Sequence, residues 1–195
     1  MRLLIGFILV FSAPAEAGLF ADRLVTAAHE RLKHDVTYDP AYVVLKYPGG
    51  DVPAHTGVCT DVIIRAYRAL GIDLQKRVHE DMRAHFKRYP TIWGASRPDR
   101  NIDHRRVPNL AVFFQRHGKR IKVTQIGSNY RPGDLVTWNL KIPGRGSLPH
   151  IGIVVKKKSK DGKRPLIVHN IGAGPVLEDM LFDYKITGHY RYQPQ

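Results

Sequence analysis

The sequence predicts an α+β protein in which amphipathic helices precede an antiparallel sheet. Apolar residues in the first half recur every three or four positions between Gly and Pro breakers, which is the helical period. The second half holds short runs rich in Val, Ile and Leu between Gly/Pro turn signals, a pattern typical of strands. Helices first and strands afterwards favour the α+β class. With 195 residues, 43% of them hydrophobic, the chain suffices for one packed domain.

The N-terminus has the pattern of a secretory signal peptide. A positively charged start, Met1-Arg2, precedes an apolar run over residues 3–11, and Ala15-Glu16-Ala17 has the small-x-small form of a cleavage site. The apolar run is shorter than the ~20 residues that a membrane-spanning helix needs. A hydrophobic core helix and a retained signal anchor are the alternatives. We expect cleavage near Ala17, a single domain over 18–195, and a periplasmic or secreted protein.

Two helices are expected before the middle of the chain. Residues 19–33 carry an apolar side chain at every fourth position, which predicts an amphipathic helix. A polar segment with several Pro and Gly breakers follows over residues 35–55. The second helix is expected to begin near Cys59 and to stop at Gly71.

Two further helices are expected before the strands begin. Asp73 is suited to cap a third helix, which should end before Pro90. Residues 91–106 are rich in Pro, Gly, Asp and Arg, and we expect a loop there. Pro108 suits the first turn of a short fourth helix over 109–117, because its fixed φ is already helical.

The second part of the chain predicts five strands. The turn Arg131-Pro132-Gly133-Asp134 leads into one of them, and a basic loop over 156–164 separates two others. The expected strands cover residues 120–126, 135–138, 150–155, 166–169 and 186–192.

Cys59 is the only cysteine, so an intrachain disulfide framework and a multi-thiolate zinc finger are both excluded. In an oxidising compartment an unpaired thiol either serves another chain or is kept free for chemistry. The expected helix start at Cys59 places the thiol where the helix dipole favours an anion, which lowers the pKa of a thiol. The alternative is a buried, inert cysteine that packs as a small hydrophobic residue.

Two histidines on neighbouring expected strands suit the other roles of a thiol enzyme. His150 opens one strand and His169 ends the next. In an antiparallel hairpin with an even loop, paired residue numbers sum to an odd value, so these two residues should share a face. The set predicts Cys59 as nucleophile, His150 as general base and His169 as the group that orients the imidazole.

Several motifs resemble two related groups of proteins. The segments Gly57-Val58-Cys59-Thr60-Asp61, Pro132-Gly133-Asp134-Leu135-Val136 and Pro149-His150-Ile151-Gly152-Ile153-Val154, with His169 ending a later strand, resemble the NlpC-type cysteine peptidases. The whole chain after residue 17 also looks like a bacterial family named only as domain of unknown function 1287. That second likeness is carried by Tyr38-Asp39-Pro40-Ala41-Tyr42, Asp73-Leu74-Gln75, His79-Glu80-Asp81-Met82, the segment 102–110 and His169-Asn170-Ile171-Gly172.

The first resemblance implies a papain-like domain, with the nucleophile at a helix start packed on an antiparallel sheet. It implies that Cys59, His150 and His169 are the three catalytic residues of an enzyme that cleaves an amide bond in bacterial cell-wall peptide. One departure concerns specificity: NlpC-type enzymes commonly have Asp-Cys-Ser-Gly, whereas Val58 and Thr60 flank the cysteine here.

Four further residues are candidates for contact with substrate: Arg105, Arg106, Asp61 and His55. An Arg pair can clamp a carboxylate, and peptidoglycan stem peptides carry several carboxylates. In the alternative interpretation the arginines form an internal ion-pair network, for instance with Asp61, that braces the Cys59 helix. His55 directly precedes the motif around the thiol, and its alternative is an ordinary surface residue.

A formal net charge of +14 predicts an anionic partner. For an exported protein we expect peptidoglycan or another anionic envelope polymer, with peripheral contact to anionic lipid, and no nucleic acid, for which no motif is present. The basic loop 156–164 is the densest cluster and is otherwise a solvated hairpin tip. No cofactor is implied. A non-catalytic envelope-binding protein and a zinc-dependent hydrolase using Cys59, His150 and His169 remain as alternatives.

Overall fold

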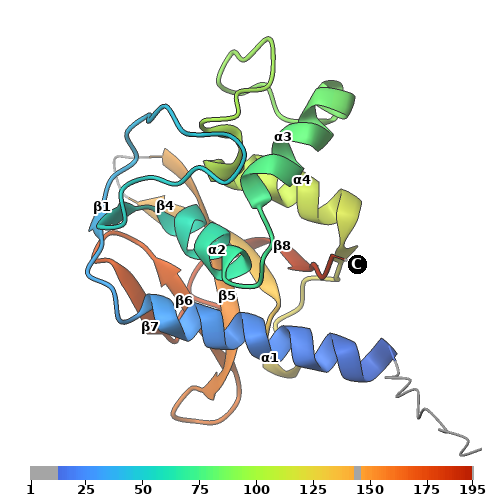
Figure 1. Cartoon of the computed structure of the whole chain (residues 1–195). Coiled ribbons are helices and arrows are strands. Elements are labelled where there is room, and N and C mark those ends of the chain that lie inside the picture. The colour runs from blue at the N-terminus through green and yellow to red at the C-terminus, as the bar shows by residue number, and fades with distance from the viewer. Residues whose placement is uncertain (1–12, 143–145, 195) are drawn as a thin grey trace, which may run out of the picture.

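The computed structural model describes residues 13–142 and 146–194. Within them, four α-helices pack on a six-stranded antiparallel sheet (Figure 1), so the predicted α+β class is confirmed. The helices are α1 (Ala13–Arg31), α2 (Cys59–Arg68), α3 (Leu74–His85) and α4 (Val107–His117). In spatial order the strands are β3 (Lys119–Arg120), β8 (Lys185–Arg191), β4 (Leu135–Ile142), β5 (Gly146–Lys158), β6 (Pro165–Asn170) and β7 (Pro175–Glu178). A separate parallel pair joins β1 (Thr37–Tyr38) to β2 (Thr56–Gly57).

The sheet brings β5 and β6 together beside the start of α2. Strands β4, β5, β6 and β7 form consecutive antiparallel pairs, and β8 returns on the other side of β4. In the β5–β6 pair, Ile153 lies opposite Val168 and Val154 lies opposite Ile167. These paired numbers sum to an odd value, so the predicted shared face of His150 and His169 is confirmed.

Each face of the sheet is covered by its own apolar cluster. Ile151 and Ile153 of β5 belong to the larger cluster, which also contains the buried faces of α1, α2, α3 and α4. Val154 and Trp138 belong to a second cluster on the other face. There the Trp138 indole donates a hydrogen bond to the Leu181 carbonyl at 3.0 Å, which fixes the segment before β8 against the sheet. Both faces of the central strands are therefore buried, which holds their histidines in fixed positions.

Helix starts follow the sequence signals closely in α3 and α4. The Asp73 carboxylate accepts the backbone N–H of Lys76 at 3.1 Å, so it is the predicted N-cap of α3. Pro108 lies in the first turn of α4, as predicted, although that helix already begins at Val107.

The N-terminal helix is longer than expected. Helix α1 begins at Ala13 rather than at Leu19, so Ala15-Glu16-Ala17 belongs to its first turns. The charged start and the apolar run of the expected signal peptide fall in residues 1–12, outside the described residues. Among the described helices, none has the length and apolar character needed to cross a membrane.

One expected strand is wrong, and β7 and the short parallel pair of β1 and β2 were missed. Only Lys119–Arg120 form a strand where residues 120–126 were expected to do so. The Tyr130 hydroxyl accepts the Thr124 N–H at 3.2 Å and donates to the Thr124 carbonyl at 2.8 Å, so a side chain takes the bonds of a sheet neighbour. The short strand β7 follows a Gly-rich turn and was not predicted, because four residues carry too little periodicity.

Candidate active site

Cys59 is the first residue of α2, and its position is fixed by the third residue of that helix. The Asp61 carboxylate accepts the backbone N–H of Val58 at 2.7 Å, which caps the helix start. The Thr60 hydroxyl donates to the Arg105 carbonyl at 3.0 Å. The thiol therefore lies at a helix start that is stabilised by its own cap and by a hydrogen bond to the segment before α4.

Arg105 and Asp61 form a buried ion pair behind the thiol. The guanidinium donates two hydrogen bonds to the carboxylate, at 3.0 and 2.9 Å, and the two side chains are only 2% and 3% exposed. Arg105 also donates to the backbone carbonyls of Ala41 and Asp39. Because the Arg105 donors and the Asp61 carboxylate are engaged in this way, the two residues form the internal ion-pair network that was the alternative to substrate binding.

The environment of the thiol differs from the expectation based on the helix dipole. Burial raises the pKa of Cys59 to about 12, although the backbone N–H groups of Ile151 and Thr60 favour the thiolate. The loss of hydration around the enclosed sulfur outweighs the helix dipole, because a thiolate in an apolar site loses more solvation than those few N–H groups restore. The expected lowering of the thiol pKa is therefore wrong, and the thiol is protonated at neutral pH.

His150 and His169 are joined directly, ring to ring. His150 Nε2 lies 3.0 Å from His169 Nδ1, and the two rings are perpendicular. Both side chains are buried, and the space between the strands depends on Gly152. A Cβ at Gly152 would lie 2.5 Å from Ile167 Cγ2 and 3.2 Å from His169 Cβ, so a side chain there would clash with Ile167 and crowd the histidine.

A third residue, which the sequence did not single out, continues this chain of hydrogen bonds. His169 Nε2 lies 3.0 Å from a carboxylate oxygen of Glu178, the last residue of β7. The missed strand explains why Glu178 was overlooked. The signal that could have found it is the pair His169 and Glu178 nine positions apart across a Gly-rich turn.

Burial keeps both imidazoles neutral. Burial, together with like-charge repulsion from the neighbouring His169, lowers the pKa of His150 to about 3. Burial also lowers the pKa of His169, although the Glu178 carboxylate opposes this shift. At neutral pH each ring therefore carries one proton, so each has one donor and one acceptor nitrogen.

The thiol contacts the backbone next to His150, and among the described residues it makes no hydrogen bond to either imidazole. One of the N–H groups that favour its thiolate belongs to Ile151, the residue directly after His150. The Asn170 side chain, next to His169, donates to the carbonyl of Gly57 at 3.4 Å, which ties the end of β6 to the segment before α2. Between described residues, no hydrogen bond joins the Cys59 sulfur to His150, so the two groups are neighbours rather than a preformed ion pair.

A pocket of about 370 Å³ opens beside the thiol. Tyr38 lines it, and burial raises the pKa of this phenol to about 12, so its hydroxyl stays a hydrogen-bond donor. Trp93 and Arg106 form another wall, with the guanidinium stacked 4.2 Å from the indole centroid. The remaining lining residues are Pro40, Val58, Ile102, Arg105, Val107, Pro108, Leu148 and Pro149.

Arg106 and His55 differ in their relation to this pocket. Arg106 lines it, is partly exposed, and also lines a neighbouring pocket with Arg97 and Arg100. Among the described residues its one acidic contact is a 3.4 Å approach to Asp103, so most of its donors have no acidic partner there. His55 is exposed and does not line the pocket, which agrees with the alternative of an ordinary surface residue.

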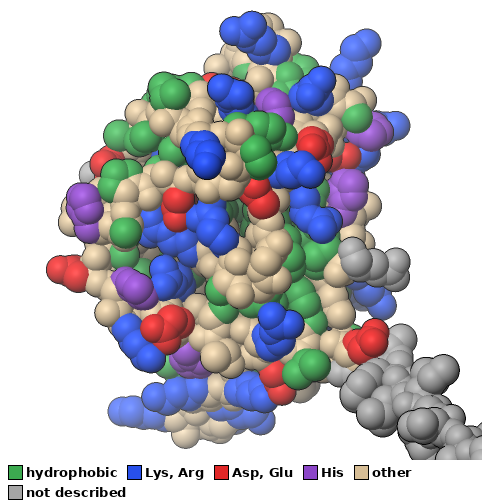
Figure 2. Space-filling view, in the orientation of Figure 1, with side chains coloured by type: hydrophobic (Ala, Val, Ile, Leu, Met, Phe, Trp, Pro, Cys, Tyr) green, Lys and Arg blue, Asp and Glu red, His purple; other side chains and the backbone are tan. Residues whose placement is uncertain are grey.

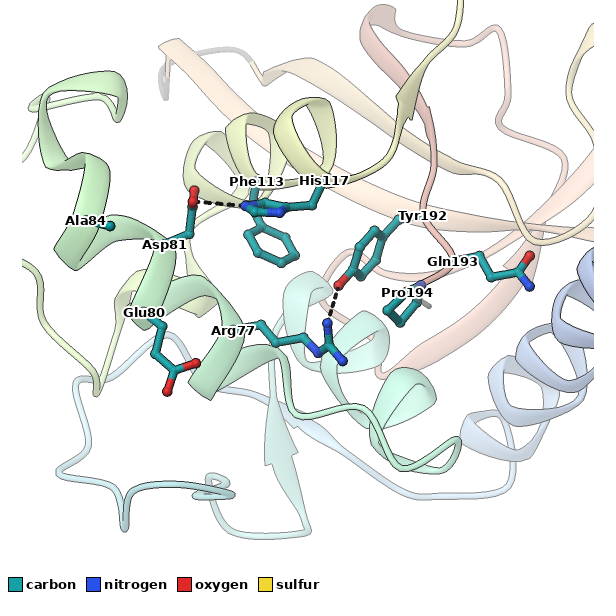
Figure 3. Close-up of a pocket in the computed structure, with 9 residues that line it drawn as sticks. All are labelled: Arg77, Glu80, Asp81, Ala84, Phe113, His117, Tyr192, Gln193 and Pro194. Carbon is teal, nitrogen blue, oxygen red and sulfur yellow. Dashed lines mark hydrogen bonds and ion pairs between the residues drawn. The ribbon is translucent and has the colours of Figure 1, made fainter.

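A larger pocket of about 600 Å³ lies elsewhere, between α3, α4 and the end of the chain (Figure 3). Asp81 faces it and contacts His117 at 2.9 Å, and Arg77 reaches the Tyr192 hydroxyl at 3.4 Å. Arg116 also binds Asp81, so this carboxylate ties α3 to α4. The pocket is lined by none of the candidate residues, and its charged groups serve the packing of two helices.

Positive charge is spread over the surface in Figure 2, with a dense group at the tip of the β5–β6 loop. In that loop Arg164 is paired with Asp179 and Asp161, and Lys156 with Asp22. The exposed lysines of the loop without such a contact between described residues are Lys157, Lys158, Lys160 and Lys163. The loop therefore offers fewer free charges than its sequence suggests.

The zinc alternative needs Cys59, His150 and His169 around one ion. Over residues 13–142 and 146–194, no group of three or more His, Cys, Asp or Glu side chains is arranged to hold a metal. The two imidazoles instead use a nitrogen each on one another.

Comparisons with known proteins give a matching family, a relative and two solved structures. The family model described as "Domain of unknown function (DUF1287)" matches residues 25–192. Over 169 residues, 87% of this chain and 80% of the relative, the chain is 50% identical to "Uncharacterized protein YijF" of Escherichia coli (strain K12). Two solved structures, NlpC1 and NlpC2 from Trichomonas vaginalis, match 90% of this chain at 16% and 15% identity with TM-scores of 0.49 and 0.47. The chain spans 45% and 47% of their lengths.

Proposed function

We propose that this chain, which belongs to the family of domain of unknown function 1287, is a cysteine amidohydrolase of the bacterial cell envelope. The single observation that carries the proposal is the arrangement of the thiol at a helix start beside a buried, hydrogen-bonded histidine pair. A nucleophile, a base and a group that orients the base are the three parts that acyl transfer from an amide requires.

The reaction begins with a neutral thiol and a neutral imidazole. As the Cys59 sulfur bonds to the amide carbonyl carbon, its proton passes to His150, and the carbonyl electron pair moves onto oxygen. The backbone N–H of Cys59 and the hydroxyl of Tyr38 are donors available to that oxyanion. The amine then leaves with the proton from His150, and a thioester to Cys59 remains.

Water completes the cycle. His150 takes a proton from the attacking water, the carbon–sulfur bond breaks, and the proton returns to the thiol. The low pKa of His150 supports this role in one respect, because the imidazole is unprotonated at neutral pH and able to accept a proton. Its reach to the sulfur requires a shift of the thiol or the ring when substrate binds, and catalytic contacts are often looser without substrate.

We propose peptidoglycan stem peptide as the substrate class and the periplasm or the cell exterior as the location. Two observations support this choice: the N-terminal sequence pattern described above and the formal net charge of +14. Arg106 stands at the mouth of the thiol pocket with free donors, and a guanidinium there is suited to a carboxylate of the stem peptide.

The experiment that tests this proposal is digestion of purified peptidoglycan, with products identified by mass spectrometry. The wild-type protein should release soluble muropeptides or peptides, and Cys59→Ala should release none. Loss of activity with EDTA and recovery with added zinc would instead favour a metal-dependent hydrolase.

A second candidate function is envelope binding without catalysis. The enclosed, protonated thiol and the missing thiol–imidazole bond favour it. Replacing Lys157, Lys158, Lys160 and Lys163 with Gln should then reduce sedimentation with insoluble peptidoglycan at low salt, because four exposed positive charges are lost. Added salt should weaken binding of the wild-type protein, because the Debye length is only ~10 Å at 0.1 M and shortens as salt rises. If the wild-type protein also cleaves nothing, binding is the function that remains.

A further inference from the structure

We infer that Glu178 is a positioning residue that determines which nitrogen of His150 is free to accept the thiol proton. The inference deepens the proposed function, since it concerns the base of the same site. It starts from three side chains on three adjacent strands, β5, β6 and β7.

The register of the sheet brings Glu178 to His169. Glu178 lies opposite Ile167 in the β6–β7 pair, and Ile167 shares a face of β6 with His169. The carboxylate oxygen is 3.0 Å from His169 Nε2, while the other nitrogen of that ring is 3.0 Å from His150 Nε2. The His169 side chain is fully buried, so its two ring nitrogens have these two neighbours and no contact with bulk water.

The proton positions follow from counting donors and acceptors. An ionised carboxylate only accepts, so His169 Nε2 must carry a proton to bond with Glu178. A neutral imidazole has one N–H, which leaves His169 Nδ1 as an acceptor. His150 Nε2 must then carry the proton of the bond between the rings, and the lone pair of His150 is on Nδ1.

This order is the one that a general base needs. With the opposite order, His169 would donate from Nδ1, His150 Nε2 would accept, and the remaining nitrogen of His150 would already carry a proton. Such a ring could not take the proton of Cys59. Without the carboxylate, nothing among the described contacts of the two rings distinguishes one order from the other.

Among the described residues, Glu178 makes few interactions besides the one with His169. Its side chain is half exposed, and His169 is its polar contact among the described residues. A carboxylate at this place contributes little to the apolar core, so its removal should alter the proton order while leaving the fold intact. The neighbouring Asp179 differs, because it holds Arg164 through two hydrogen bonds.

The test measures tautomers directly and needs no substrate. The full-length protein is labelled with ¹⁵N-histidine, and long-range ¹H–¹⁵N correlation spectra are recorded at pH 7 for wild type, Glu178→Gln, Glu178→Ala and the control Asp183→Ala. Asp183 is an exposed carboxylate in the segment before β8. Substitutions His150→Gln and His169→Gln assign the signals.

In the wild-type protein and in Asp183→Ala, both rings should carry their proton on Nε2. In Glu178→Ala the ratio of tautomers of His169 should change by about tenfold or more, since a hydrogen bond to a charged group is worth ~1.5–3 kcal/mol. Glu178→Gln keeps the shape and an acceptor oxygen but adds a donor, so it should give an intermediate ratio. Alkylation of Cys59 should be fastest in the wild-type protein, slower in Glu178→Gln and slowest in Glu178→Ala.

A wild-type His169 with its proton on Nδ1, or a Glu178→Ala spectrum identical to wild type, would overturn the inference. These outcomes are separate from the proposed function, because they are read from the rings alone. A protein that cleaves no peptidoglycan but carries both Nε2 protons would support this inference and contradict the proposed function. An active protein with the opposite proton order would support the proposed function and contradict this inference.

Discussion

His150 Nε2 lies 3.0 Å from His169 Nδ1, and both rings are buried on the same face of the sheet. Two imidazoles at this distance cannot both be charged, because the repulsion adds to the loss of hydration. Burial lowers the pKa of both rings, so each is neutral at pH 7 and carries one proton, and one of these two protons lies in the bond between the rings. This state is suited to general-base catalysis from an unprotonated imidazole, rather than to a preformed thiolate–imidazolium pair.

The first prediction concerns stability in acid. Burial lowers the pKa of His104 and of His150 from 6.5 to about 3 in the folded protein. Between these values the unfolded chain binds protons that the folded chain does not, so stability falls as pH falls from about 6.5 toward 3. Each group contributes a slope of up to about 1.4 kcal/mol per pH unit.

His104→Leu tests this slope, because one nitrogen of the buried ring has no hydrogen-bond partner among the described residues. Repulsion from Arg105 and Arg68 contributes to this low pKa of His104, and Asp51 and Asp99 oppose it. Urea unfolding at pH 7 and pH 4.5 should show a smaller loss of stability for the variant than for wild type. Equal losses would mean that His104 binds its proton equally well in the folded and unfolded states, and so would contradict the lowering of its pKa by burial.

The second prediction concerns the ion pair behind the thiol. Arg105→Ala leaves the Asp61 carboxylate buried without its partner, which should lower the free energy of unfolding by about 3–5 kcal/mol. The matched control is Glu30→Ala, which removes an exposed pair with Lys33 and should leave stability nearly unchanged, because solvent screens the exposed charges. Urea unfolding of both variants gives the comparison, and similar small losses would contradict an internal bracing role for Arg105.

The third prediction concerns the reactivity of the thiol. Because burial raises the pKa of Cys59 to about 12, iodoacetamide should modify the native protein slowly at pH 6 and faster as pH rises through 9. His150→Ala should slow the reaction, and the exposed control His55→Ala should not. Mass spectrometry of samples quenched over time gives the rates. Rapid modification at pH 6 would show a thiolate, and so contradict the effect of burial.

The fourth prediction concerns Arg106 as a substrate contact. On a soluble stem peptide, Arg106→Ala should raise KM about tenfold or more with a small change in kcat, as loss of a charge-assisted hydrogen bond does. The control Arg131→Ala removes an exposed arginine that does not line the thiol pocket and should change neither constant. Amidation of the substrate carboxylates should abolish the difference between wild type and Arg106→Ala. A persistent difference would assign Arg106 to the structure of the pocket instead.

Much of the site follows from the sequence, because it depends on local signals and strand parity. Cys59 at a helix start is marked by the turn before it, and His150 and His169 share a face by the odd sum of paired residue numbers. Glu178 could not be found this way, since the strand that presents it has four residues. The Arg105–Asp61 pair was expected only as an alternative to substrate binding, because a choice between the two depends on contact between residues distant in sequence.

The thiol pKa shows a different kind of failure. The helix dipole is a local property that the sequence reveals, whereas the burial that opposes it depends on how α2 packs against β5. The charge of the 156–164 loop shows the same distinction. Asp22 and Asp179 come from other parts of the chain and neutralise two of its cations.

The central claim is that Cys59 attacks an amide of peptidoglycan with His150 as its base, and peptidoglycan digestion by folded variants tests it most directly. Wild type, Cys59→Ala, His150→Ala and His169→Ala are compared at equal concentration, with circular dichroism to confirm folding and mass spectrometry to identify the bond cut. The account predicts products from wild type, none from Cys59→Ala or His150→Ala, and a large reduction for His169→Ala. Full release of products by folded Cys59→Ala would contradict it.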